Sequence, residues 1–193
     1  MQKVDMHDKF LFIKESDHSF IMFVPPDMSS VKKFRQELNK SLQLHHFPEE
    51  DIFQIELACD EALTNSISAN VQHQCQETII CRWRIEGFKF SLIILDYGRG
   101  FLPEKTLKKE YPKNLNELVT NFKKLQEECS RILPYDGVQK PHKNMGQGFK
   151  IITKLMDTVK ILYHAEDNIL EDPTITDRIE GSILELEFYC KKK

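Results

Sequence analysis

Residues 54–69 read QIELACDEALTNSISA, and this stretch contains the pair Glu61 and Asn65. Four residues apart on a helix, these two side chains project from one face, with their Cβ atoms roughly 5–6 Å apart. Counted around the helix, the same face carries Leu57, Ala58 and Ala62. A carboxylate and an amide in such apolar surroundings need partners, and a Mg²⁺ ion with an ordered water is one suitable set.

Two interpretations of this helix are open from its residues alone. In the first, the amide oxygen of Asn65 ligates Mg²⁺, and the carboxylate of Glu61 orients or deprotonates a nucleophile beside the metal. In the second, the stretch is an ordinary amphipathic helix with two polar residues at the margin of the core. The rest of the chain has to decide between them.

The composition is that of one ordinary globular domain. The 193 residues are 40% hydrophobic with a formal net charge of −3, which gives no sign of general binding to nucleic acid or membranes. The polar start, MQKVDMHDKF, shows no signal peptide, and the sequence has no apolar run long enough to span a bilayer. The five cysteines form no CxxC pair, which favours reduced thiols. We therefore expect a cytoplasmic protein.

Two glycine motifs follow the central helix. A predicted strand at residues 89–95 runs into DYGRG at residues 96–100, where the glycines let the backbone turn sharply and approach a ligand. GQGF at residues 146–149 opens a helix, and the free N–H groups of a helix start suit a phosphate. Neither motif has the spacing of a Walker A loop or of a dinucleotide fingerprint. Each motif alone is also compatible with an ordinary turn.

The hydrophobic pattern predicts paired strands with helices between them. Pro48, followed by three acidic residues, marks the start of the central helix. A mixed, mainly antiparallel sheet covered on one face by helices accounts for this order. We expect strands at residues 9–13, 19–24, 78–85, 89–95, 159–163 and 182–189, and a polar acidic loop at residues 166–180. We expect one helix through residues 31–42, a second that starts at Pro48 and carries Glu61 and Asn65, and a third that opens at residues 146–149 and runs through residue 156.

Residues 101–145 differ from the rest of the chain. Lys and Arg exceed Asp and Glu there by 9 − 6 = 3, whereas the whole chain has a net charge of −3. Apolar residues at helical spacing indicate an amphipathic helix over residues 115–132. A long segment between two glycine motifs is more often a lid or a binding insertion than a silent connection, and a solvated surface helix is the alternative.

Taken in order, these motifs resemble those of the GHKL ATPase superfamily, named for gyrase, the heat-shock chaperone, histidine kinases and MutL. ELACDEALTNSI is similar to its first box, LIILDYGRGF to its second, MGQGFKIITKLMDTVKI to its third, and IEGSILELEF resembles its last strand. The closest resemblance is to the anti-sigma factor serine kinases of bacterial partner-switching systems. The resemblance implies an α+β, Bergerat-type two-layer sandwich, formed by a single domain over residues 1–193 with an ATP lid inserted at about residues 101–145.

The resemblance also implies a role for each motif residue. Asn65 would ligate Mg²⁺, and Glu61 would act as the general base toward the attacking hydroxyl or water. Asp96 would accept a hydrogen bond from the exocyclic amine of adenine, and Ser182 would join that network. The other ATP-binding positions would be Gly98 and Gly100 on the adenine side, and Gly146, Gly148 and Phe149 on the phosphate side.

Two features depart from the family pattern. Many relatives carry a basic residue or a histidine three or four positions after the asparagine, where this chain has Ser68 and Ala69. Neither side chain can neutralise a phosphate, and the lid is longer than this subfamily leads us to expect. Our hypothesis is that a lid residue replaces the missing charge; the candidates are Arg131, Lys140, His142 and Lys143.

The resemblance predicts a serine/threonine protein kinase that uses ATP and Mg²⁺. Its substrate would be an antagonist protein of the anti-anti-sigma type, and it would also sequester a sigma factor, with no direct contact to nucleic acid. An alternative, motivated by Ser68 and Ala69, is a nucleotide-gated binding module without kinase activity. The catalytic domain of a histidine kinase is disfavoured, because no phosphoacceptor helix pair is recognisable before the first box. By analogy with relatives, we also expect a homodimer.

Overall fold

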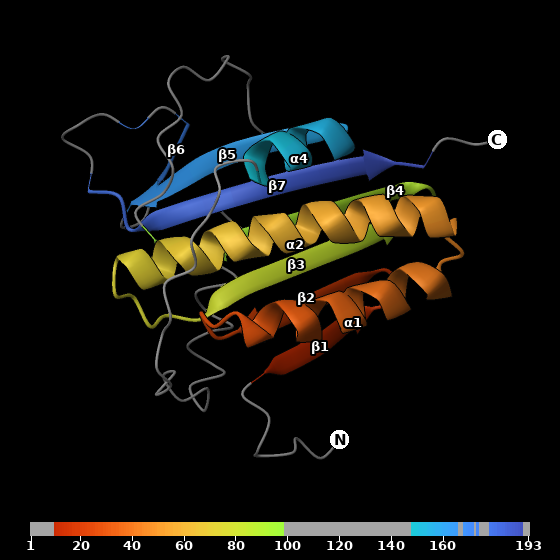
Figure 1. The fold of residues 1–193 in the computed structure, drawn as a ribbon, viewed down its shortest axis with the longest axis horizontal. Helices are drawn as coiled ribbons and strands as arrows, with labels where there is room; N and C mark the ends of the chain where they lie inside the picture. The colour runs from red at the N-terminus through yellow and green to blue at the C-terminus, as the bar shows by residue number, and fades with distance from the viewer. Residues whose placement is uncertain (1–9, 99–147, 166–167, 172, 174–177, 191–193) are drawn as a thin grey trace.

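A seven-stranded sheet with helices on one face forms the described part of the chain in this computed structural model (Figure 1). The structure describes residues 10–98, 148–165, 168–171, 173 and 178–190. Its strands are β1 (Leu11–Ser16), β2 (Ser19–Val24), β3 (Ile79–Glu86), β4 (Lys89–Asp96), β5 (Thr158–Ala165), β6 (Asn168–Leu170) and β7 (Gly181–Tyr189). Its helices are α1 (Ser29–Leu44), α2 (Glu49–Gln72) and α4 (Gly148–Leu155).

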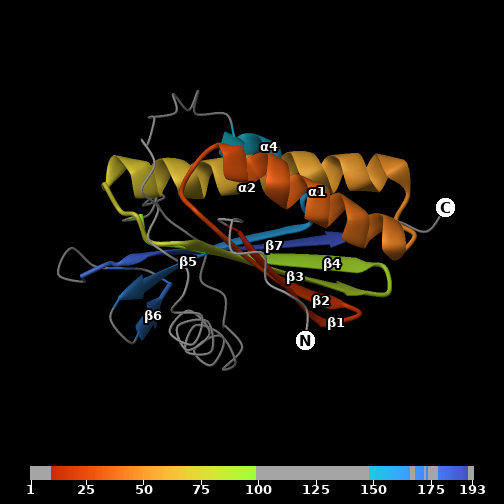
Figure 2. The same cartoon turned by 90° about the horizontal axis from the view of Figure 1, so that it is seen from below.

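The strands lie in the order β1-β2-β3-β4-β7-β5-β6. In Figure 2 the three helices lie together on one side of this sheet. The predicted α+β, two-layer fold class is therefore confirmed. The sheet that we expected to be mixed is antiparallel at every pairing among the described residues.

Two details of the predicted element pattern differ from the structure. The predicted loop at residues 166–180 contains the short strand β6, which pairs with β5. Three residues are too few to show the alternation that marks a strand. Strand β1 ends at Ser16 rather than at residue 13, because its pairing with β2 continues toward the turn. The predicted lid at residues 101–145 and its helix lie outside the described residues.

Helix α2 begins directly after Pro48, with its three acidic residues in the first turn, as predicted. Polar contacts along one side of α2 hold it against α1. Arg35 of α1 forms an ion pair with Asp60, and Asn39 donates a hydrogen bond to Glu56 at 2.8 Å. Because Glu56 and Asp60 are engaged with α1, the two acidic side chains of α2 closest to Glu61 in sequence are held away from the α4 side.

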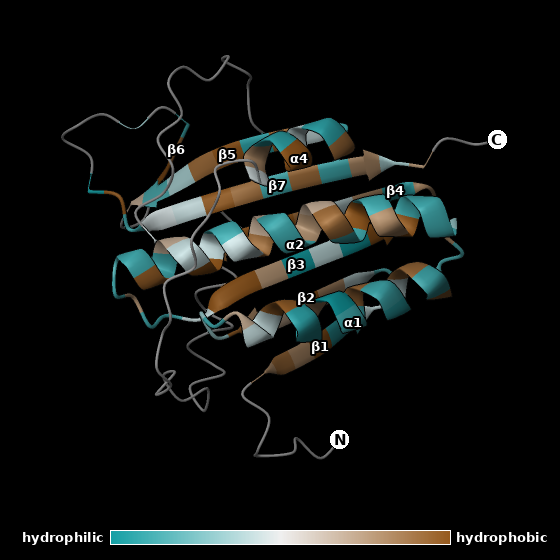
Figure 3. Ribbon diagram, viewed as in Figure 1, coloured by the Kyte–Doolittle hydropathy of each residue, from teal (hydrophilic) through white to brown (hydrophobic). Residues whose placement is uncertain are grey.

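Hydrophobic residues pack on both faces of the sheet. In Figure 3, hydrophobic and hydrophilic residues alternate along α1 and α2, as expected for helices that bury one side. The main core lies between these helices and the sheet, and a second cluster lies on the opposite face. At the carboxyl end of β4, Ile94 belongs to the first cluster and Leu95 to the second. The residue that follows them, Asp96, is therefore held by packing on both sides of the strand.

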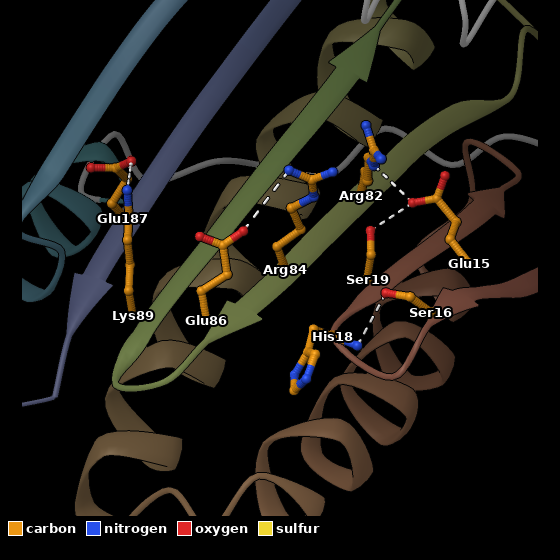
Figure 4. Close-up of polar contacts among 9 residues, drawn as sticks. All are labelled: Glu15, Ser16, His18, Ser19, Arg82, Arg84, Glu86, Lys89 and Glu187. Atoms are coloured by element: carbon orange, nitrogen blue, oxygen red, sulfur yellow. Dashed lines mark hydrogen bonds and ion pairs between the residues drawn. The ribbon is translucent and has the colours of Figure 1, made fainter.

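Charged side chains cover part of the face of the sheet on which no helix packs (Figure 4). Glu15 accepts a hydrogen bond from Arg82 at 2.9 Å, and Lys89 pairs with Glu187 at 2.5 Å. Such cross-strand pairs near the surface contribute little stability each. They keep this part of the face hydrophilic. The pair of Lys89 and Glu187 lies at the end of the sheet remote from Asp96, since Lys89 begins the strand that Asp96 ends, whereas Arg82 lies opposite Ile93 in the middle of β3.

Candidate functional site

The start of α4 lies against the middle of α2, beside Glu61 and Asn65. A Cβ atom added to Gly148, the first residue of α4, would stand 2.5 Å from Oε2 of Glu61 and 3.5 Å from Nδ2 of Asn65. The first distance is shorter than any real contact of this kind, so the absence of a side chain allows the close approach. The first and third predicted motifs, which are remote in sequence, are thus neighbours in space.

This junction of α2 and α4 combines a carboxylate, an amide and the N–H groups of a helix start. The first N–H groups of a helix have no partner inside the helix, and the helix dipole favours an anion there. An amide oxygen such as that of Asn65 is a ligand type that Mg²⁺ accepts. Glu61, Asn65 and Phe149, the second residue of α4, are all partly exposed. The junction can therefore meet a phosphate and a metal from solvent.

Replacement of Gly148 by alanine is expected to lower ATP turnover by about tenfold or more while the fold keeps its stability. The new methyl group would displace the carboxylate of Glu61, and a misplacement of about 1 Å at a catalytic group costs up to ~100-fold in rate. Alanine is also the better helix former. Phosphate release and thermal unfolding measure the two effects, with Lys150→Ala on the exposed side of α4 as the control. A folded variant with normal turnover would contradict the arrangement.

The carboxylate of Asp96 is buried at the end of β4 among hydrogen-bond donors. Its Oδ2 accepts from the hydroxyl of Ser182 at 2.8 Å, and its Oδ1 accepts from the N–H groups of Gly98 at 3.1 Å and Ser182 at 3.3 Å. Burial raises the pKa of this carboxyl to about 6, against the opposing effect of the hydrogen bonds from Ser182 and Ser66. The result is an acceptor fixed in direction, which is what the predicted contact with an adenine amine requires.

Two glycines let the backbone pack closely around Asp96. A Cβ atom at Gly98 would overlap that of Ala69 on α2, so the turn after β4 rests directly on the helix. A Cβ atom at Gly181 would overlap the main-chain oxygen of Asp96. A side chain at either glycine would push the turn away from its support. The second glycine of the DYGRG motif, Gly100, lies outside the described residues.

The two positions that depart from the family pattern are used for packing. The hydroxyl of Ser68 donates to the carbonyl oxygen of Thr64 at 2.8 Å, and Ser68 is buried. Ala69 packs against Gly98. A charged side chain at either position would need a different local packing. The predicted phosphate residue Gly146 and the basic candidates of the lid (Arg131, Lys140, His142 and Lys143) lie outside the described residues.

Helix α2 connects the two groups of predicted residues. Glu61 and Asn65 lie beside α4, whereas Ser66, Ala69 and Asn70, in its last turns, lie around the end of β4. The sequence interpretation missed Ser66, Asn70 and His164, which are all buried near Asp96. The only signal in the sequence was that Ser66 directly follows Asn65. Nothing in the pattern distinguishes Asn70 and His164 from ordinary polar residues.

The preference for ATP over its 6-deamino analogue, purine riboside triphosphate, is expected to weaken as the pH falls below about 6. The pKa of Asp96 is raised to about 6, so the carboxylate becomes protonated in that range and accepts the adenine amine less well. Calorimetric titration of both nucleotides between pH 5.5 and 8 measures the ratio of their affinities, in which the titration of the phosphates cancels. A ratio that stays constant would show that Asp96 does not contact the amine.

The candidate site thus combines, on a two-layer α+β fold, a helix start beside a carboxylate and an amide with a buried aspartate after a strand. A family model for the histidine kinase-like ATPase domain matches residues 24–171, which is more than half of the chain. The chain therefore belongs to the histidine kinase-like ATPase family, and the predicted membership of the GHKL superfamily is confirmed. A comparison with curated proteins finds no match. Among the described residues, no helix has the length and apolar character needed to cross a membrane.

Proposed function

We propose that this ATP-binding domain is a cytoplasmic serine/threonine kinase that phosphorylates an anti-anti-sigma-type antagonist protein and also sequesters a sigma factor. Membership of the histidine kinase-like ATPase family supports ATP binding. The kinase activity, its substrate and its partners are the further step. The observation that supports phosphoryl transfer is the junction of α2 and α4, where Gly148 stands directly against Glu61 and Asn65. The antagonist and the sigma factor are proposed from the resemblance of the motifs to those of the anti-sigma factor kinases.

In this mechanism the hydroxyl of the antagonist attacks the γ-phosphorus of ATP. Its proton passes to the carboxylate of Glu61, the bond to the bridging oxygen breaks, and ADP leaves. The N–H groups at the start of α4 bind phosphate oxygens through the helix dipole. Asn65 would hold a Mg²⁺ ion, which would supply neutralisation of the charge on the transferring group. Phosphoryl transfer depends mainly on such positioning and charge neutralisation.

A second candidate function is a nucleotide-gated binding module without kinase activity. The observation that favours it is the packing of Ser68 and Ala69. Neither position supplies the positive charge that many relatives place near the phosphates. A site with less positive charge at the γ-phosphate would still bind ATP, but it would transfer the γ-phosphoryl group more slowly.

The experiment that separates the two functions is incubation of the purified protein with γ-labelled ATP and a purified anti-anti-sigma-type domain. A control reaction uses the same domain with its acceptor serine or threonine replaced by alanine. Label that appears on the antagonist, and disappears in the alanine control, supports the kinase. ATP binding by calorimetry together with no transfer to any tested antagonist would overturn the kinase proposal in favour of the binding module.

Sequestration of a sigma factor is a separate part of the proposal. We expect a purified sigma factor to co-elute with the protein in ATP and to be displaced by the unphosphorylated antagonist. Sedimentation of the protein alone at several concentrations tests the expected homodimer. A sigma factor that never co-elutes, in ATP or in ADP, would remove this part and leave the kinase reaction unaffected.

A further inference from the structure

One peptide unit, between Asp96 and Tyr97, is held on both sides by buried side chains. The carbonyl oxygen of Asp96 accepts a hydrogen bond from Nε2 of His164 at 2.8 Å, which requires the Nε2 nitrogen to carry a proton. The N–H group of Tyr97 donates to Oδ1 of Asn70 at 3.0 Å. His164 is 1% exposed and Asn70 is fully buried. We call these two residues the peptide clamp.

Each member of the peptide clamp is itself fixed by neighbours. The ring of His164 meets the ring of Tyr97 edge to face, with centroids 5.2 Å apart and an interplanar angle of 84°. Asn70 also donates through Nδ2 to the carbonyl oxygen of Glu77 at 3.0 Å. Gly181 makes room, since a Cβ atom there would overlap both the Asp96 oxygen and Nε2 of His164. The clamp therefore has little freedom to rotate.

The peptide clamp holds the backbone directly after Asp96, where the orientation of the peptide affects the direction of the Asp96 side chain. The orientation of a peptide plane sets the backbone dihedral angles on either side of it, and with them the direction of the adjacent side chain. Sheet pairing ends here, because Asp96 is the last residue of β4 and pairs with Ser182 near the start of β7. Beyond this point the ladder cannot hold the chain, and two side chains from α2 and β5 hold it instead.

We propose that His164 and Asn70 are positioning residues that aim the Asp96 carboxylate at the exocyclic amine of a purine nucleotide. This inference rests on the role proposed for Asp96 in binding adenine. It extends that role to two buried residues that lie outside the motifs and hydrogen-bond to the peptide unit after Asp96. A clamp that only stabilises the fold would affect all nucleotides alike, whereas an aiming role acts through the amine alone.

The test compares ATP with purine riboside triphosphate, which differs from it only in lacking the exocyclic amine. Their dissociation constants are measured by calorimetry for the wild-type chain and for His164→Phe, which keeps a ring against Tyr97 and removes the donor. We expect the wild-type protein to bind ATP more tightly than the analogue. In the variant the ratio of the two affinities should be about tenfold smaller, because a misaligned hydrogen bond to a charged group contributes less to binding. His164→Gln, whose amide nitrogen can occupy the place of Nε2, should restore it, and His164→Asn, which is too short, should not.

The outcomes separate the clamp from the role of Asp96. A wild-type chain that binds both nucleotides equally would overturn the assignment of Asp96, and the clamp with it. A wild-type preference that persists unchanged in His164→Phe, or equal weakening of both nucleotides, would overturn the clamp alone. If His164→Phe does not fold, Asn70→Ala releases the other side of the same peptide, and the same loss of preference is expected from it.

Discussion

Replacement of Glu61 by alanine is expected to lower phosphoryl transfer by about 100- to 10,000-fold and to leave ATP affinity nearly unchanged. Removal of the carboxylate takes away the group that would receive the proton of the attacking hydroxyl, whereas the helix start at Gly148 and the carboxylate of Asp96 keep their positions. A loss in the rate alone is the signature of an interaction made only in the transition state. Transfer of label from ATP and calorimetric titration of ATP measure the two effects.

The matched control for this substitution is Glu56→Ala. It removes the same charge from the same helix, at a side chain that faces α1 and bonds to Asn39. Its transfer rate should stay near that of the wild-type chain. Glu61→Gln, which keeps the shape and loses the basicity, should behave like the alanine variant. If either variant of Glu61 still transferred phosphate at the normal rate, Glu61 would not be the base.

Replacement of Asp96 by asparagine is expected to weaken ATP binding by about 10- to 100-fold without destabilising the unliganded protein. The carboxylate accepts from Ser182 and from the N–H of Gly98, and the proposed role adds the adenine amine. An asparagine that keeps its oxygen toward the N–H groups would turn its own NH₂ group toward the amine, so two donors would meet. Loss of a hydrogen bond to a charged group costs about 1.5–3 kcal/mol, which corresponds to this range.

Asp96→Asn should weaken ATP binding, but it should not lower the stability of the protein, because a buried charge on Asp96 is unfavourable for folding. The pKa of Asp96 is raised from its ordinary value of 3.8 to about 6, so the folded protein holds the proton more tightly than the unfolded chain does. The contribution of this carboxyl to the free energy of unfolding therefore falls as the pH rises from about 4 to about 6. At pH 7 the Asp96→Asn variant should unfold at the same urea concentration as the wild-type chain or at a higher one.

Asp157→Asn is the control for both measurements. Asp157 is exposed and accepts a hydrogen bond from the N–H of Tyr189, at the other end of β7 from Ser182. Its substitution should leave ATP affinity unchanged and should not raise stability at pH 7. If Asp96→Asn bound ATP as tightly as the wild-type chain, the adenine role of Asp96 would be wrong. A large loss of stability at pH 7 would instead contradict the cost assigned to the buried charge.

Much of the fold could be predicted from the sequence because its elements are locally encoded. The apolar positions of α1 and α2 recur at helical spacing, and Pro48 with three acids marks the start of α2. The strands from β2 to β4 alternate or run apolar over six to eight residues, which is long enough to recognise. β6 was missed because its three residues carry no periodicity, and its position depends on pairing with β5.

The site could be predicted only at the positions that belong to recognisable motifs. The order of the three motifs resolved the two interpretations of Glu61 and Asn65 in favour of a nucleotide site, and the family match bears out the superfamily. The roles of individual residues in that site stay predictions. Ser66, Asn70 and His164 could not be found, because each is an ordinary polar residue whose importance comes from burial next to Asp96.

The sequence by itself determined the class of fold, the order of the motifs and the face of α2 that carries Glu61 and Asn65. These features depend on spacing along one helix or one strand, which local chain geometry fixes. Only the tertiary structure decided which motifs meet. It placed Gly148 against Glu61, used Ser68 and Ala69 for packing, and clamped the peptide after Asp96 between His164 and Asn70. Those contacts join residues far apart in the chain, so they arise from the packing of layers and not from any local pattern.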